Sequence, residues 1–126
     1  MIMVLEEGVN MKNIHYSSYM RFLNCLNAMD ASSAEKKLDA IERQLLDYVM
    51  LGFSQAREIL VGDLLVLAHI GSQATLHGRI KHLDKLGFVK LVVDGEDHRK
   101  KKVVPTKMAV KHYEKLSTLL ELAAAL

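Results

Sequence analysis

The stretch 88–105 is typical of a β-hairpin. Two β-favouring runs, at 88–93 and 100–104, flank a polar segment that begins with Asp94 and Gly95. That segment is about six residues long, which is longer than the tightest hairpin turns. Pro105 ends the second run because proline has no backbone N–H, and Thr106 is suited to cap a following helix. The sequence therefore predicts a two-stranded hairpin with a highly charged tip, followed directly by a helix.

Outside this hairpin, apolar residues recur at spacings of three and four, which is typical of amphipathic helices. Ser32 and Glu35 have the spacing of a capping box and predict the start of the second helix, which should end near Gly52. Ser72 is suited to cap a later helix, and Gly87 to stop it. The predicted helices are 15–29, one between Ser32 and Gly52, 62–70, 72–86 and one from about 107, and 57–61 is a single brief strand.

Length and composition indicate one globular domain. The chain has 126 residues, of which half are apolar and a quarter charged, so it is able to bury a core. Cys25 is its only cysteine, which rules out an internal disulfide framework and fits a reducing cytoplasm. The first eight residues lack a basic start and contain Glu6 and Glu7, so they do not indicate a signal peptide. No apolar stretch approaches the length of a membrane span, and a cytoplasmic protein without a membrane partner is expected.

The charge of the chain is unevenly distributed. Residues 1–70 hold six Lys and Arg against nine Asp and Glu, a net charge of −3. Residues 71–115 hold eleven against five, a net charge of +6. Such a basic region is either an ordinary solvated surface or a surface that binds a polyanion, and charge alone does not decide between the two.

The order of the predicted elements favours DNA binding. A short helix, a turn at Gly-Ser and a second helix with a polar outer face have helix-turn-helix geometry, and a hairpin that follows directly is a wing. Residues 61–107 resemble the winged helix of MarR-type bacterial and archaeal transcription regulators in the segments "VGDLL", "SQATLHGRIKHLDKLGFV" and "DGEDHRKKKVVPT". The residues that match the family motifs are Ser72, Thr75, Leu76, Leu83, Gly87, Phe88, Val89, Asp94, Asp97 and Arg99.

The chain departs from the family pattern at two positions. His98 stands where the family often has the first arginine of the wing. Gly78 lies inside the predicted recognition helix, where a basic or polar residue is common. A glycine inside a helix costs about 1 kcal/mol relative to alanine. Gly78 is therefore either merely tolerated or allows the backbone to approach DNA closely.

The resemblance implies a mainly α fold with a small β-hairpin wing, in a single domain over 1–126. It implies a winged-helix core at 57–105, dimerisation helices at 12–29 and 107–126, and a homodimeric, nucleoid-associated transcription regulator that binds double-stranded DNA. The recognition helix 72–86 would enter the major groove and the wing 88–104 would reach the backbone or minor groove, where Asp97 would aim Arg99. The residues expected to contact DNA are Ser72, Gln73, Thr75, His77, Lys81, Asp97, His98, Arg99, Lys100 and Lys101.

Other functions are weighed against this one. A winged helix also serves as a protein-interaction adaptor without DNA binding, and a regulator is sometimes gated by a small-molecule effector or by oxidation. Cys25 is interpreted as a core residue, with redox sensing as the alternative. The six histidines do not predict a metal site, because His77 and His82 are five residues apart, off the spacing of paired helical ligands. No cofactor is expected, and no phosphate-binding loop, nucleophile elbow or carboxylate pair indicates an enzyme.

Overall fold

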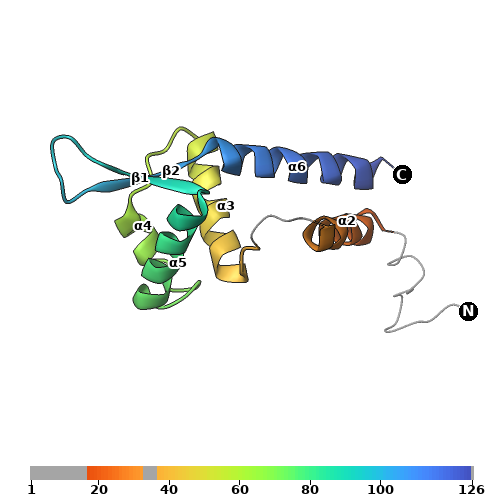
Figure 1. The fold of residues 1–126 in the computed structure, drawn as a ribbon, viewed down its shortest axis with the longest axis horizontal. Coiled ribbons are helices and arrows are strands. Elements are labelled where there is room, and N and C mark those ends of the chain that lie inside the picture. The colour runs from red at the N-terminus through yellow and green to blue at the C-terminus, as the bar shows by residue number, and fades with distance from the viewer. Residues whose placement is uncertain (1–16, 33–36, 126) are drawn as a thin grey trace, which may run out of the picture. The chain divides into compact units, whose positions relative to one another are not determined.

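Figure 1 shows a mainly helical chain with a two-stranded hairpin, in a computed structural model that describes residues 17–32 and 37–125. This arrangement confirms the predicted fold class. The described residues form two compact units: a terminal unit of 17–32 with 113–125, and a winged-helix unit of 37–112. In chain order the elements are α2 (Ser18–Ser32), α3 (Ala40–Ser54), α4 (Val61–Leu65), α5 (Gln73–Leu86), β1 (Val89–Val93), β2 (Lys101–Pro105) and α6 (Lys107–Ala124).

The core of the winged-helix unit lies between α3, α4, α5 and the hairpin. α3 packs against α5 and β2, and α4 packs against the same two elements. Full burial of one Leu, Ile or Val side chain stabilises the fold by about 1.5–3 kcal/mol, so these apolar faces hold α5 in place. The buried apolar residues of this unit are Leu45, Leu46, Val49, Ile59, Leu64, Leu76, Ile80, Leu83, Phe88, Val89, Val103 and Ala109.

The start of α3 differs from the prediction. Its cap is Asp39, whose Oδ1 accepts a hydrogen bond from Glu42 N at 2.8 Å, while Glu42 Oε1 accepts one from Asp39 N at 2.9 Å. The predicted capping box at Ser32 is wrong, because Ser32 is the last residue of α2; its partner Glu35 lies outside the described residues. Both pairs have the same spacing, and the reciprocal cap forms at the one that leads directly into the buried face of α3.

The segment between α3 and α5 is less regular than predicted. The expected strand at 57–61 is wrong as a strand, because only Leu60 forms a bridge, to Lys102, with Val103 N donating to Ile59 O at 2.8 Å. The expected helix at 62–70 is only Val61–Leu65, and turns follow it. A short apolar run has too few residues to distinguish a strand, a helical turn and a packed connection by periodicity alone.

The hairpin forms within one residue of its predicted bounds. β1 and β2 pair antiparallel, with Val89 opposite Pro105 and Val93 opposite Lys101. Figure 1 shows the hairpin extending away from the helices of its unit, with the turn at the far end. The structure thus confirms a wing-shaped hairpin directly after α5.

Two predicted caps hold the base of the wing. Gly87 has φ 91°, in the left-handed region that favours glycine, and Phe88 N beyond it donates to Leu83 O at 3.0 Å. Thr106 Oγ1 donates to Gly87 O at 2.6 Å and accepts from Ala109 N at 3.2 Å. One hydroxyl therefore joins the end of α5 to the start of α6.

Replacing Gly52 with alanine is expected to destabilise the fold by about 1–3 kcal/mol. Gly52 lies in α3, and a Cβ there would lie 2.6 Å from the side chain of Ile59, which is itself buried. The measurement is urea unfolding of the whole chain. The control is Gly62→Ala in α4, where a Cβ would meet nothing within 4 Å. Equal stability of the two variants would contradict the close packing of Gly52 on Ile59.

Candidate nucleic-acid interface

α5 has one buried face and one face that is open to solvent. Leu76, Ile80 and Leu83 are buried on the first. At 100° per residue, the stripe opposite these three positions contains 74, 78, 81 and 85. Each of these residues is exposed, and the stripe, which we call the outer stripe, consists of Ala74, Gly78, Lys81 and Lys85.

The predicted contact residues of α5 have different surroundings. Ser72 Oγ accepts from Thr75 N at 3.2 Å and donates to Thr75 Oγ1 at 2.9 Å, so these two hydroxyls mainly cap the helix. Gln73 and His77 are exposed on the flank of α5 between the buried face and the outer stripe, and Lys81 lies on the stripe. Sequence reasoning left Ala74 and Lys85 out of the contact set, although counting helical positions from the buried leucines would have found both.

The tip of the wing is held by hydrogen bonds between residues that are close in sequence. Asp94 N donates to Lys100 O at 2.9 Å, and Lys100 N donates to Asp97 O at 3.0 Å. Asp97 Oδ1 accepts from Arg99 N at 3.0 Å and lies 3.3 Å from Arg99 Nε. The Arg99 side chain is nevertheless 93% exposed. Asp97 therefore holds the root of Arg99 while its guanidinium stays accessible to a ligand.

Hydrogen bonds within the chain shift the pKa values of two charged residues in the wing, Asp94 and Lys102. The Glu96 N–H, 2.9 Å from Asp94 Oδ1, is the main cause that lowers the pKa of Asp94. Lys102 Nζ lies 2.8 Å from Glu58 Oε1, and this hydrogen bond is the main cause that raises the pKa of Lys102. Asp94 is therefore anionic, and Lys102 already forms an ion pair with Glu58. The side chains of His98, Lys100 and Lys101 are exposed.

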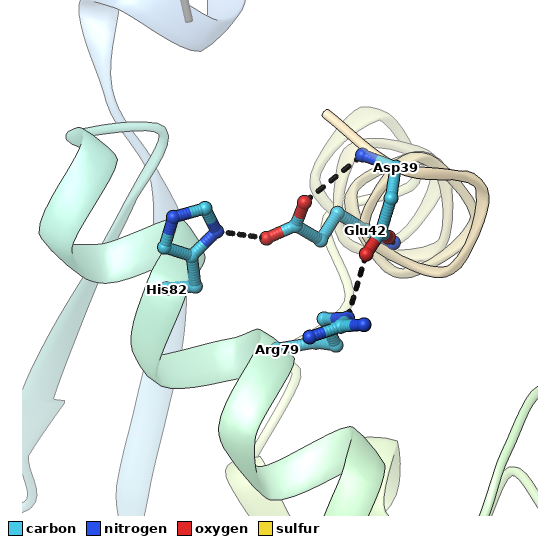
Figure 2. Close-up of polar contacts among 4 residues, drawn as sticks. All are labelled: Asp39, Glu42, Arg79 and His82. Atoms are coloured by element: carbon cyan, nitrogen blue, oxygen red, sulfur yellow. Dashed lines mark hydrogen bonds and ion pairs between the residues drawn. The ribbon is translucent and has the colours of Figure 1, made fainter. Parts of the chain in front are cut away.

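Two polar contacts tie α5 to the start of α3, as Figure 2 shows. Arg79 Nε lies 2.7 Å from Asp39 Oδ2. The Nε–H bond does not point at this oxygen, so the contact is an ion pair without a hydrogen bond. One turn further along α5, His82 Nδ1 contacts Glu42 Oε2. Glu42 is only 2% exposed, and its other oxygen caps α3. Sequence reasoning missed this cluster because its two halves lie 40 residues apart.

Other kinds of site have less support. Within residues 17–32 and 37–125, no three His, Cys, Asp or Glu side chains are placed to hold a metal ion together. None of the described helices has the length and apolarity needed to span a membrane. Cys25 is a half-buried free thiol in α2. A cavity of about 190 Å³ lies between α3 and β2, with Phe53 and Val104 in its wall.

Known structures share this architecture. No protein-family model matches the sequence, and no curated protein matches it significantly. A mutant of S. aureus MepR bound to an oligodeoxyribonucleotide has a TM-score of 0.65 and 16% identity, over 91% of this chain and 76% of that one. An S. aureus MepR–DNA complex has 0.61 and 15%, over 88% and 82%. The transcriptional regulator Tm0710 from Thermotoga maritima has 0.59 and 18%, over 88% and 70%. The chain therefore shares the winged-helix fold of these proteins.

Proposed function

We propose that this protein is a MarR-type transcription regulator that binds duplex DNA as a homodimer. α5 enters the major groove, and the hairpin wing lies at the phosphate backbone and minor groove. The observation that carries the proposal is the distribution of exposed cations: Lys81 and Lys85 on the outer stripe, and Arg99 with Lys100 and Lys101 on the wing. The proposal is supported by two MepR structures that are described as DNA complexes.

The geometry suits each element to a different part of the duplex. The major groove is about 12 Å wide and admits a helix. α5 presents a polar, solvent-facing surface of sufficient length, and its buried leucines fix its orientation on the unit. The wing carries a flexible cation on a short ordered loop, which suits phosphates and the narrower minor groove. The proposed contact residues are Ser72, Gln73, Thr75, His77, Lys81, Asp97, His98, Arg99, Lys100 and Lys101. We add Ala74 and Lys85 to the proposal because both are exposed on the outer stripe.

The terminal unit is proposed to form the dimer. Arg21 Nε donates to Ala123 O at 2.8 Å, so α2 and the end of α6 contact each other within this unit. Tyr19, Leu120 and Leu122 are nevertheless 67%, 54% and 59% exposed. Several large exposed apolar side chains on one unit favour an interface between subunits. The surface is proposed to lie within 12–29 and 107–126, of which 12–16 and 126 are outside the described residues.

The alternatives have less support from the described residues. An adaptor has no need of a basic helix and wing on the same unit. The cavity beside Phe53, at about 190 Å³, is smaller than the 300–1,000 Å³ usual for a small-molecule site. Gating by an effector or through Cys25 stays a hypothesis. A location in the cytoplasm, with the nucleoid, follows from the proposed activity.

The test compares Arg99→Ala with Gln73→Ala on two DNA duplexes over a range of salt concentrations. Arg99→Ala should weaken binding to a selected operator and to a scrambled duplex together, and should reduce the salt slope by about one phosphate contact. Gln73→Ala should lose about 1–3 kcal/mol on the operator and little on scrambled DNA, because base edges in the major groove carry the sequence. If neither substitution altered binding to either duplex, the adaptor would be the better account.

A further inference from the structure

Gly78 occupies the middle of α5 on the outer stripe, and nothing within the described chain accounts for a glycine there. A Cβ at this position would meet no heavy atom within 4 Å. Gly87 is the one described glycine with a positive φ, so the helical backbone at Gly78 suits any L-residue. Glycine is also less favourable than alanine inside a helix. The fold would therefore be more stable with a side chain at this position.

Gly52, by contrast, is a helical glycine that packing within the chain explains. It is also inside a helix, but a Cβ there would overlap the side chain of Ile59. No such neighbour exists for Gly78 among residues 17–32 and 37–125. Its neighbours on the outer stripe are Ala74, one turn earlier, and Lys81, about one turn later. The described residues therefore give no reason for the glycine, which lies on the face that carries the exposed cations of α5.

We propose that Gly78 is the point of closest approach between α5 and the floor of the DNA major groove, which makes it a specificity-determining residue. This inference rests on the proposed function. With no side chain at Gly78, the helix backbone itself lies against a base-pair edge. Lys81 and Lys85, further along the same stripe, then reach the phosphates at the groove rim. A side chain at 78 would lift the helix and weaken the base contacts made by the other exposed residues of α5.

The consequence is a separation between sequence-specific and general binding. Phosphate contacts position the protein on any duplex and are made by long, adjustable lysine and arginine side chains. Base contacts depend on helix depth, because hydrogen bonds weaken steeply when their distance and angle change. A methyl group at Gly78 should therefore impair operator recognition far more than binding to random DNA.

The experiment measures thermal unfolding and DNA affinity of the full chain for Gly78→Ala and Gly78→Leu. The probes are a duplex selected from random sequences with the wild-type protein and a scrambled duplex of the same composition. For Gly78→Ala we expect a melting temperature a few degrees higher, because helix propensity improves. We expect operator affinity to fall about tenfold or more and affinity for the scrambled duplex to change less than about twofold. Gly78→Leu should weaken operator binding further.

Gly62→Ala is the matched control. Gly62 is the other exposed helical glycine whose Cβ would meet nothing, and it lies in α4, off the outer stripe. Its alanine variant should keep operator affinity. Unchanged operator affinity of Gly78→Ala, equal weakening on both duplexes, or a lower melting temperature would each overturn the inference. If the wild-type protein bound no duplex at all, the proposed function would fail first and the inference with it.

Discussion

Replacing Glu42 with alanine is expected to lower the free energy of unfolding by about 2–3 kcal/mol. Glu42 is 2% exposed and its two oxygens serve two partners: Asp39 N at the start of α3, and His82 Nδ1 on α5. Loss of a helix cap costs about 1 kcal/mol. Loss of a hydrogen bond to a charged group costs about 1.5–3 kcal/mol, and the lower end applies because the His82 side chain is 47% exposed.

Urea unfolding measures this effect, and the chain offers a matched control. Glu58 forms an ion pair with Lys102 at 2.8 Å, but its side chain is 56% exposed. Glu58→Ala should therefore cost less than about 1 kcal/mol. Glu42→Gln keeps an oxygen that accepts from Asp39 N and should fall between the two. A loss for Glu42→Ala no larger than that for Glu58→Ala would show that the cluster in Figure 2 does not hold α5 on α3.

The same cluster marks the limit of what the sequence predicts. The hairpin, the caps at Ser72, Gly87 and Thr106, and the buried face of α5 depend on residues close in sequence, and all are found as predicted. Predictions from short sequence patterns were wrong where more than one local structure fitted the residues. Ser32 and Asp39 both start a capping-box pattern, and tertiary packing selected Asp39. The short run 57–61 forms only a bridge because its register is set by β2, more than 40 residues later.

The candidate interface shows a similar division. Lys81 and Arg99 were predicted to be accessible from local patterns, and both are exposed. Whether a hydroxyl is available for a ligand depends on contacts that the pattern does not give, and the Ser72 and Thr75 hydroxyls are already bonded to each other. The contacts from α5 to Asp39 and Glu42 link residues 40 apart, and no periodicity encodes such a pairing. The twelve proposed DNA contacts are predictions that measurements of DNA binding test.

Making the terminal unit polar is expected to have the largest effect on DNA binding. The variant carries both Leu120→Asn and Leu122→Asn. Both leucines are more than half exposed in the single subunit, so the substitution should remove little folding energy. If they lie in the dimer interface, the polar pair should leave a monomer at micromolar concentration. Light scattering measures the mass, and circular dichroism checks that the helices persist.

The loss of DNA affinity should follow from the loss of the dimer. Two linked recognition helices bind adjacent half-sites with an avidity gain of about 10²–10⁴-fold, and dimers of this kind space their half-sites about 34–36 Å apart. The variant should therefore lose that factor on a selected operator with two half-sites. On a duplex with a single half-site it should bind about as well as the wild type, because asparagine changes no charge near the wing or α5.

Leu51→Asn is the matched control for this last prediction. Leu51 is 58% exposed, so it is as accessible as the two leucines of α6, but it lies in α3 within the winged-helix unit. This variant should stay dimeric and keep its operator affinity. A double variant of α6 that remained dimeric would place the interface elsewhere. A monomeric variant with full operator affinity would instead show that one winged-helix unit recognises the operator alone, and the dimer would then have no part in reading the site.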